Sequence, residues 1–387
     1  MRGGSVSQPH VAIVHDWLDT WRGGENVLAE ILAMYPEAGL YALVDFLPEA
    51  HRPRLLDRRA RTTFLQRIPG ARRHFRVLLP LFPAAIESLD ISDYDVVISI
   101  SHAVAKGVRT HEKQLHICYC LTPMRYAWDL REAYLASARA EQGLRRLVAD
   151  CILDRLRRWD AASSNRVNRF IAISDYIAKR IRSCYARDAA VIYPPVDIDF
   201  FTPVEAPPAR AAYFTASRWV PYKRVDLIVE AFRALPHRRL IVAGDGPDTA
   251  RVCAAATPNV EFVGEVSRER LRDLMRGAHA FLFAAEEDFG ILPVEAQACG
   301  TPVIAFGRGG VLETVRGLGT RQPTGVLFGE QSGAAISAAV HEFEMHAREI
   351  DSVDCRVNAE RFAVSRFRAD MGRYVEGAWS EFVSRRR

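Results

Sequence analysis

Two carboxylates, Glu287 and Glu295, lie on either side of a short segment that predicts a loop followed by a helix. Glu287 closely follows Ala280–Ala284, an apolar run that predicts a buried strand. Pro293 is favoured in the first turn of a helix, so the helix that carries Glu295 should begin near this proline. We therefore expect Glu295 near a helix start at the carboxyl edge of a parallel sheet, where α/β proteins bind ligands.

The residues between the two carboxylates indicate what kind of ligand would fit. Phe289 and Gly290 predict a tight turn, and the backbone N–H groups of Phe289, Gly290 and Ile291 can bind a phosphate or sugar oxygen. A carboxylate such as Glu295 can accept two hydrogen bonds from a vicinal diol, such as that of a ribose. The arrangement suits a nucleotide sugar. The alternative is an ordinary strand-to-helix turn, in which the helix dipole favours an acidic residue.

The chain continues with a strand predicted at Thr301–Phe306 and a glycine-rich turn at Gly307–Glu313. From Glu286 to Val315 it resembles the donor site of the retaining family-4 glycosyltransferases, which has an acidic pair around Phe-Gly, then Gly-Thr-Pro-Val and a Gly-Gly turn. The resemblance implies the α/β GT-B fold. This fold has two Rossmann-like domains whose parallel sheets face each other across a cleft, and a C-terminal helix that crosses back to the first domain.

A basic loop follows the strand predicted at Ala212–Ala216 and leads into a predicted helix. Arg218 can bind a diphosphate through parallel hydrogen bonds, and Lys223 adds a mobile point charge. In isolation, a solvated basic turn is the simpler interpretation. The resemblance implies that these two residues bind the donor diphosphate, with Arg224 as the adjacent alternative to Lys223.

A Gly-Gly pair, Gly23 and Gly24, follows the first predicted strand, His10–Val14, and precedes a predicted helix. Glycines allow the backbone to approach a bound group, and helix N–H groups can bind an anion. A simple loop is the alternative, but the family has a glycine-rich loop here that contacts the donor phosphate. His15 and Asp16, at the end of the strand, could also face the cleft.

Segments 99–107 and 121–129 each follow a predicted strand of the first half. The second contains Thr-Pro-Met-Arg-Tyr-Ala-Trp-Asp, which resembles the GDP-mannose-dependent mannosyltransferases of O-antigen and exopolysaccharide assembly. That subgroup often has a histidine where this chain has Leu121, and His102 could serve nearby, although a lone histidine is more often simply packed. The resemblance implies three acceptor-side residues: Arg125, Tyr126 and Asp129.

Two other motifs suggest different chemistry. Gly244–Thr249 approximates the dinucleotide-binding pattern, but Pro247 breaks it, so a dehydrogenase is the weaker interpretation. The family has Gly-Asp-Gly-Pro here beside the nucleotide, and the resemblance places Gly246 and Val266 at the donor. Asp93-Tyr-Asp95 resembles a metal-binding DxD motif, but it precedes its strand. We therefore expect no obligatory metal and no cofactor besides the donor.

The region His51–Arg76 holds nine arginines and a single acidic residue, Asp57. Such a basic amphipathic surface suits an anionic bilayer or a polyprenyl-diphosphate acceptor, and a solvated basic face is the alternative. Nucleic acid is not expected as a partner, because no recognised binding module accompanies the charge. The apolar residues interleaved with the arginines are Phe64, Leu65, Ile68 and Phe75.

The bulk composition agrees with a soluble enzyme of the cytoplasm, and the chain is long enough to build two domain cores. The chain has 387 residues, a net charge of +5 and seven cysteines without metal-ligand spacing, which favours reduced thiols. No apolar run approaches the ~18 residues of a spanning helix, and residues 1–9 do not resemble a signal peptide. If the protein binds the inner face of the cytoplasmic membrane, we expect it to do so as a peripheral membrane protein.

Proline-rich residues 193–203, together with Pro207-Pro208, predict an interdomain linker. The expected domains are an acceptor-side domain over residues 1–203, joined by the final helix at about 366–387, and a donor domain over residues 204–365.

The resemblance implies a retaining hexosyltransferase. Mannose from GDP-mannose would be moved onto a polyprenyl-diphosphate-linked oligosaccharide in bacterial surface polysaccharide biosynthesis. A UDP-hexose donor and a non-catalytic protein that binds a nucleotide sugar or lipid are the alternatives. The candidate catalytic residues are Arg218, Lys223, Glu287 and His102. The candidate donor-binding residues are Gly23, Gly24, Gly246, Val266, Phe289, Gly290, Ile291 and Glu295.

Overall fold

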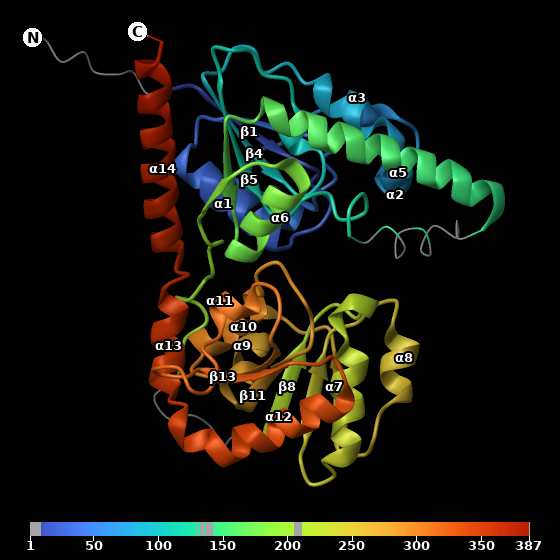
Figure 1. Cartoon of the computed structure of the whole chain (residues 1–387), viewed down its shortest axis with the longest axis vertical. Coiled ribbons are helices and arrows are strands. Elements are labelled where there is room, and N and C mark those ends of the chain that lie inside the picture. Colours follow the sequence, from blue (N-terminus) through green and yellow to red (C-terminus); the bar gives the residue numbers. More distant parts are fainter. Residues whose placement is uncertain (1–8, 130, 132–134, 136–141, 205–210, 387) are drawn as a thin grey trace, which may run out of the picture. The chain divides into compact units, whose positions relative to one another are not determined.

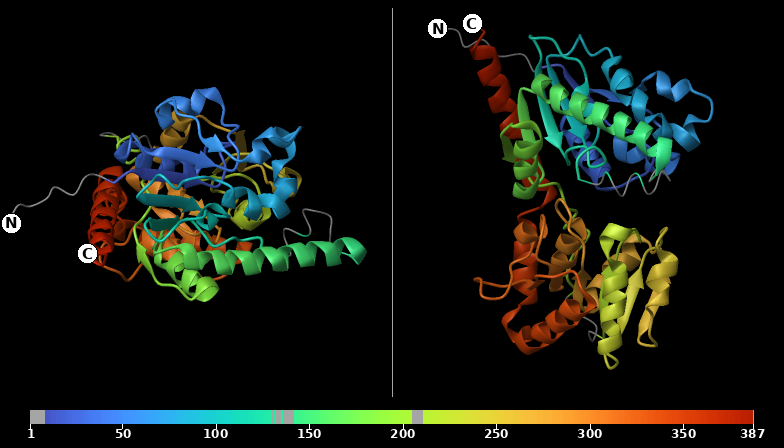
Figure 2. Two further views of the ribbon diagram at one scale, coloured as in Figure 1. Left: turned by 90° about the horizontal axis from the view of Figure 1, so that it is seen from above. Right: turned by 45° about the vertical axis from the view of Figure 1, so that its right-hand side comes forward.

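The computed structural model describes residues 9–129, 131, 135, 142–204 and 211–386. The chain divides into two compact units (Figures 1 and 2). The first comprises Met1–Pro194 and Phe367–Arg387, and the second comprises Pro195–Arg366. Each is an α/β unit built on one parallel sheet, as expected for the fold.

The first unit has a seven-stranded sheet in which every strand pairs in parallel with its neighbours. Its strands, in spatial order, are β3 (Arg61–Thr62), β2 (Gly39–Ala42), β1 (Val11–His15), β4 (Val96–Ser101), β5 (Leu115–Cys120), β6 (Arg169–Ala172) and β7 (Ala189–Val191). Its α-helices are α1 (Gly23–Met34), α2 (Ala71–His74), α3 (Phe82–Glu87), α5 (Gly143–Ser163), α6 (Asp175–Tyr185) and α14 (Val364–Ser384). Short 3₁₀ helices complete it: η1 (Glu49–Leu55), η2 (Phe64–Arg67), η3 (Phe75–Leu81), η4 (Ala105–Gly107) and η5 (Ser164–Arg166).

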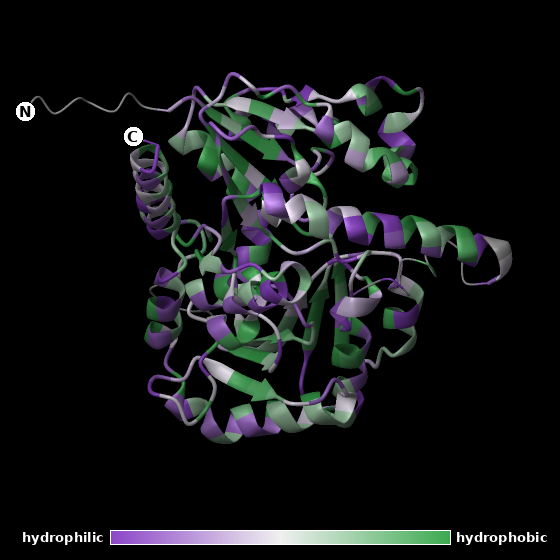
Figure 3. Ribbon diagram, turned by 45° about the horizontal axis from the view of Figure 1, so that its top comes forward, coloured by the Kyte–Doolittle hydropathy of each residue, from purple (hydrophilic) through white to green (hydrophobic). Residues whose placement is uncertain are grey.

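Burial on both faces explains why the central strands are almost wholly apolar, as Figure 3 shows by their colour. Ala12 and Val14 of β1 face one apolar cluster, which α2, η3, α3 and α5 complete. The C-terminal helix α14 packs beside α1, where Arg368 donates a 2.6 Å hydrogen bond to Glu30. Residues from Phe367 onward thus belong to the first unit.

The second unit has a six-stranded parallel sheet. Its strands, in spatial order, are β10 (Val260–Gly264), β9 (Leu240–Ala243), β8 (Ala212–Ala216), β11 (Ala278–Phe283), β12 (Val303–Phe306) and β13 (Gly325–Phe328). Its helices are η6 (Pro221–Lys223), α7 (Val225–Ala231), η7 (Phe232–Ala234), α8 (Thr249–Ala254), α9 (Arg268–Arg276), α10 (Ile291–Ala298), α11 (Val311–Thr314), α12 (Gly333–His346), η8 (Ala347–Glu349) and α13 (Ser352–Glu360).

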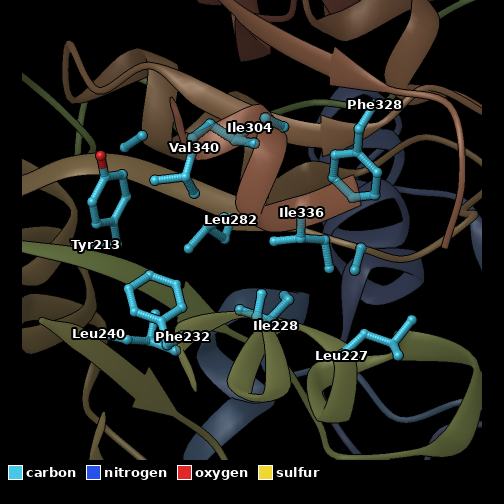
Figure 4. Packing of buried hydrophobic residues seen from close by; sticks show 14 of the residues in the cluster. Tyr213, Leu227, Ile228, Phe232, Leu240, Leu282, Ile304, Phe328, Ile336 and Val340 are labelled. Atoms are coloured by element: carbon cyan, nitrogen blue, oxygen red, sulfur yellow. The ribbon is translucent and has the colours of Figure 1, made fainter. Parts of the chain in front are cut away.

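One core of the second unit lies between its sheet and the helices α7 and α12. Figure 4 shows strand residues such as Leu282 and Ile304 facing Ile228 of α7 and Ile336 of α12. All four side chains are buried. This packing fixes the orientation of β8 and β11, whose carboxyl ends carry the predicted site.

The unit boundary lies earlier than the predicted one, because residues 195–203 bind to the second unit. Val196 N–H donates to the carbonyl of Phe362, and Arg356 donates to the carbonyls of Ile198 and Phe201. Pro207-Pro208 lie outside the described residues. Within the described part of the chain, no helix is both long and apolar enough to cross a membrane.

Each sheet has one topological switch point, where the strand order reverses between two neighbouring strands. It lies between β1 and β4 in the first sheet, and between β8 and β11 in the second. The loops that follow these two strands diverge, which leaves a crevice for ligands in open α/β sheets. These loops carry Asp16 and His102 in the first unit, and Arg218, Lys223 and Glu287 in the second.

Candidate functional site

The switch point of the second sheet brings two of the predicted catalytic residues into contact. Lys223, the last residue of η6, forms an ion pair with Glu287, which lies in the loop between β11 and α10. Their side chains are 16% and 19% exposed, so the pair is partly shielded but reachable from solvent. The sequence predicted both as catalytic residues from separate segments, and the structure joins them.

The neighbouring arginines distinguish Lys223 from its alternative. Arg224 adopts a left-handed φ of 52° at the start of α7, and its guanidinium lies 3.3 Å from Asp226. Arg251 also donates to Asp226, at 2.6 Å. Arg218, by contrast, is exposed, and its side chain has no hydrogen-bond or ion-pair partner in the part of the chain that the structure describes. Arg218 is thus available to an anion, whereas Arg224 is engaged.

Two glycines hold the Glu287 loop in place. Gly309 forms a parallel bridge with Glu287, and Gly310 N–H donates to the Glu287 carbonyl at 2.8 Å. A Cβ on Gly309 would lie 2.3 Å from that carbonyl oxygen, and one on Gly310 would lie 2.4 Å from Cα of Phe289. Any side chain at either position would push the loop away. The Gly-Gly turn noted in the sequence is therefore a backbone contact that positions Glu287.

The helix that carries Glu295 begins at a glycine. Gly290 has φ +86° and precedes Ile291, the first residue of α10. The buried ring of Phe289 packs edge-on against Phe362, with centroids 5.4 Å apart. This anchor fixes the turn and points the first N–H groups of α10 out of the helix end, where they have no intrahelical acceptor.

Glu295 lies in the second turn of α10, slightly deeper than expected. Burial raises its pKa to about 7, the nearby Arg268 lowers it and Asp197 raises it. Its carboxyl group has no hydrogen-bond partner among the described residues, although the residue is only half-buried. Close to neutral pH, this group can change its charge when a ligand binds.

The Gly244–Thr249 loop supports the Arg218 loop. A Cβ on Gly244 would lie 1.8 Å from the carbonyl oxygen of Ser217, and one on Gly246 would lie 2.2 Å from that of Trp219. Gly246 therefore has a packing role, whether or not it also binds a donor. Val266, predicted beside the donor, is half-buried in the loop after β10.

At the switch point of the first sheet, Asp16 organises the loop after β4. Its carboxylate accepts four backbone N–H groups at 2.6–3.0 Å, from His102, Ala103, Val104 and Ala105. Burial alone would raise the pKa of Asp16, but the charge and hydrogen bonds of His102 outweigh it and hold the pKa well below its usual value. Asp16 is fully buried and bound to this loop, and its expected place beside a ligand cleft stays a prediction.

His15 is also fully buried, and its expected place beside the cleft likewise stays a prediction. Its Nε2 lies 3.4 Å from Glu25, and Glu25 accepts the N–H of Arg22 at 2.7 Å. Glu25 was not predicted, although an acid three residues after a helix start is the usual signal for such a cap. Gly23 and Gly24 are half-buried at the start of α1. A Cβ on Gly24 would lie 2.9 Å from Leu121, so these two residues meet at the carboxyl edge of the sheet.

His102 remains partly accessible, with 31% of its side chain exposed. Its Nδ1 lies 2.9 Å from Asp16, and its ring packs edge-on against Trp17 with centroids 4.5 Å apart. Burial lowers the pKa of His102, but the charge of Asp16 outweighs burial and raises it overall. His102 is thus held in one orientation, as expected of a positioned side chain.

Polar side chains of the 121–129 segment bind it to the helices α5 and α6. Asp129 is exposed and forms an ion pair with Arg180 of α6, which also donates to Thr122 at 2.8 Å. Trp128 Nε1 donates at 2.8 Å to Asp160, the buried partner of Lys106. Arg125 and Tyr126 are half-buried in the same turn. Arg180 and Asp160 were not predicted, because both come from distant helices with no local motif.

The metal-site motif lies where the sequence placed it, before a strand. Asp95 directly precedes β4 and accepts the N–H of His10 at 2.9 Å, at the amino edge of the sheet. Among the described residues, no three His, Cys, Asp or Glu side chains group as metal ligands would.

Comparison with known sequences gives a match to the second unit. Residues 199–360 match the family model of the group 1 glycosyl transferases. The D-inositol 3-phosphate glycosyltransferase of Mycobacterium sp. (strain KMS) is 32% identical over 176 residues, covering 39% of this chain and 40% of that protein. The enzyme of that name from Mycobacterium leprae (strain Br4923) is also 32% identical, and 41% of its length is covered. The chain thus spans about two fifths of the length of the curated relatives that it matches.

Solved structures resemble nearly the whole chain. Anabaena Alr3699/HepE in complex with UDP superimposes with a TM-score of 0.69 at 15% identity, covering 95% of this chain and 100% of that one. Sucrose-phosphate synthase (tll1590) from Thermosynechococcus elongatus gives a TM-score of 0.69 at 19% identity, with 96% and 100% covered. At these identities the likeness establishes the fold.

Proposed function

We propose that the protein transfers a hexose from a nucleotide sugar to an acceptor, because residues 199–360 match the group 1 glycosyl transferase model and the chain has the GT-B fold. The observation that carries this proposal is the switch point of the second sheet. There, the exposed Arg218 and the Lys223–Glu287 pair lie on the two diverging loops, and Glu295 lies on the helix that follows. Cations, a helix N-terminus and a carboxylate are the groups that a nucleotide diphosphate sugar requires.

In this proposal each group has a separate task. Arg218 and Lys223 bind the diphosphate and stabilise the charge that develops on it as the sugar leaves. Glu295 accepts hydrogen bonds from the ribose diol. Glu287 and the N–H groups from Phe289 to Ile291 position the hexose, and Gly23 and Gly24 approach the donor phosphate.

The chemical step proposed is front-side displacement with retention. The bond between the anomeric carbon and the phosphate oxygen breaks, and the acceptor oxygen forms its bond on the same face of the sugar. The acceptor proton passes to the departing phosphate. No carboxylate nucleophile and no obligatory metal are invoked, so activity should persist in excess EDTA. Loss of activity that Mg²⁺ restores would contradict this part.

We propose GDP-mannose as the donor and a polyprenyl-diphosphate-linked oligosaccharide as the acceptor. The support for both is the resemblance of residues 122–129 to GDP-mannose-dependent enzymes of surface polysaccharide assembly. Such an acceptor would bring the protein to the inner face of the cytoplasmic membrane. A UDP-hexose is the second candidate donor, favoured by the fold match to a protein solved with UDP. A non-catalytic binding protein is the alternative that Leu121 keeps open.

A donor panel tests the proposal directly. Thermal shifts with GDP, UDP, GDP-mannose and UDP-glucose identify the nucleotide, and release of nucleoside diphosphate in the presence of lipid-linked acceptors measures turnover. Glu287→Gln, which keeps the shape but loses the charge, is the matched inactive control. Binding without turnover would favour the non-catalytic alternative, and no binding of any nucleotide would refute the proposed function.

A further inference from the structure

A run of short helices in the first unit carries exposed arginines. η2, α2, η3 and α3 follow one another, and no acidic residue occurs between Asp57 and Glu87. Arg67, Arg72 and Arg73 are exposed, and their side chains make no hydrogen bond or ion pair with the part of the chain that the structure describes. Three uncompensated cations are therefore gathered on one short stretch.

The other arginines predicted for this basic surface bind side chains or carbonyl groups of the protein, so the surface with free cations is smaller than predicted. Arg52 is buried and forms an ion pair with Asp45 at 2.6 Å. The remaining contacts join Arg54 to the side chain of Asn26, Arg58 to the carbonyl of Pro36, Arg59 to Glu49, Arg61 to the hydroxyl of Tyr41, and Arg76 to Asp19.

The apolar residues of the surface also differ from the expected set. Leu65 and Phe75 belong to the core, and Ile68 packs against it, so these three cannot enter a membrane in the folded protein. Phe64 is 45% exposed, as expected. Val77 is 76% exposed and Leu81 is 42% exposed, and neither was predicted.

The segment from Ala71 to Leu81 carries both buried and exposed side chains. Ala71 of α2 and Phe75 and Leu79 of η3 are buried and hold the segment against the core. Arg73, Val77 and Leu81 of the same segment are exposed. Cationic and apolar side chains are therefore both exposed on one short segment whose backbone is anchored in the core.

We propose that the 64–81 surface, formed by Phe64, Arg67, Arg72, Arg73, Val77 and Leu81, docks on an anionic phospholipid bilayer. The guanidinium groups bind lipid phosphates, and the apolar side chains enter the boundary between headgroups and acyl chains. The proposal deepens the proposed function, on which it rests for its lipid-linked acceptor. Interleaved cations and exposed aliphatic groups suit a membrane better than an acidic protein, whose surface has no acyl layer.

Vesicle binding of the full chain tests the surface without donor or acceptor. The probes are vesicles of phosphatidylglycerol mixed with phosphatidylcholine, and of phosphatidylcholine alone. Replacing Arg67, Arg72 and Arg73 by serine should weaken binding to the anionic vesicles roughly 100-fold at low salt, at about fivefold per charge. The matched control removes the same charge from exposed arginines of the second unit, by replacing Arg233, Arg321 and Arg348.

A second variant separates insertion from charge attraction. Val77→Ser with Leu81→Ser should weaken binding by a factor that persists at high salt, because insertion of apolar groups is not screened. Equal effects of the two triple-arginine variants, or equal binding of the parent protein to both kinds of vesicle, would overturn the proposal. Since no sugar transfer is measured, failure of the proposed transferase activity would leave this result unaffected.

Discussion

Replacing Glu295 by glutamine should make the folded protein less sensitive to pH. Burial raises the pKa of Glu295 from 4.5 to about 7, so the folded state keeps a proton that the unfolded state has lost between these values. Stability therefore falls as pH rises through this window and is fully reduced above about pH 7. Glutamine has the same shape and no charge, so the variant should lack this loss.

The size of the effect follows from the pKa. At about 1.4 kcal/mol per pH unit, the charged carboxylate would destabilise the folded state by at most about 3 kcal/mol above pH 7. Glu295 is only half-buried, and solvent screening reduces the effect, so we expect about 1–2 kcal/mol. For a unit of this size, that corresponds to a shift of the thermal midpoint of roughly 2–8 °C.

Ligand binding should depend on pH in the opposite sense. The ionised carboxylate is the better acceptor for a ribose diol, so nucleotide-sugar affinity of the parent should rise as pH passes about 7. The variant should bind more weakly above pH 7, by about 1.5–3 kcal/mol, with no rise of its own. A nucleotide sugar is the proper probe, because its diphosphate diester does not titrate in this range.

Two measurements on parent and variant decide the matter: thermal midpoints, and calorimetric affinity, each at about pH 5 and about pH 9. The reasoning requires the variant to gain stability relative to the parent at the higher pH and to lose affinity there. If the stabilities of the parent and of the variant change with pH in the same way, the raised pKa of Glu295 is refuted. Unchanged affinity at both pH values would remove Glu295 from the site.

Three further predictions concern the architecture of the site. Arg218→Ala and Lys223→Ala should each lower kcat more than they raise KM, because charge develops on the leaving diphosphate; parent rates in both would remove them from the site. Gly310→Ala should abolish donor-induced thermal shifts, because its Cβ would collide with the Glu287 loop, whereas Gly329→Ala, whose Cβ meets nothing within 4 Å, should behave as the parent does. Equal shifts in both variants would contradict that role. Asp16→Asn should cost about 3–5 kcal/mol in urea unfolding, since a buried charge-assisted network is broken, and a loss within experimental error would disprove it.

The long apolar strands of both sheets could be predicted because burial on two faces leaves no ambiguity. The strand expected at Ala212–Ala216 was found with the same bounds. The short edge strands β3 and β7 were missed, since two or three residues carry no periodicity. The long helix α5 was missed as well, because charged residues, five of them arginines, interrupt its apolar residues along its whole length.

The residue types at the donor site could be predicted, but their contacts could not. Lys223 and Glu287 are far apart in sequence, and their pairing depends on β8 and β11 being neighbours in the sheet. The roles of Gly309 and Gly310 likewise depend on a backbone approach between two loops. A local pattern can indicate a turn, but it does not reveal which segment lies against it.

The two switch points have the same topology and differ in what their carboxylates bind. Asp16 accepts four N–H groups from one backbone loop, so no ligand could take those bonds without unfolding the loop. Glu287 instead binds a flexible lysine side chain, and both are partly exposed, so a phosphate could compete for Lys223 while the backbone stays in place. A residue that binds a ligand must be able to exchange its protein partner for the ligand, as Lys223 can. A residue that supports a loop must keep its partners, as Asp16 does. On this ground we infer that Asp16 holds the His102 loop in position and that the chemistry centres on Lys223 and Glu287.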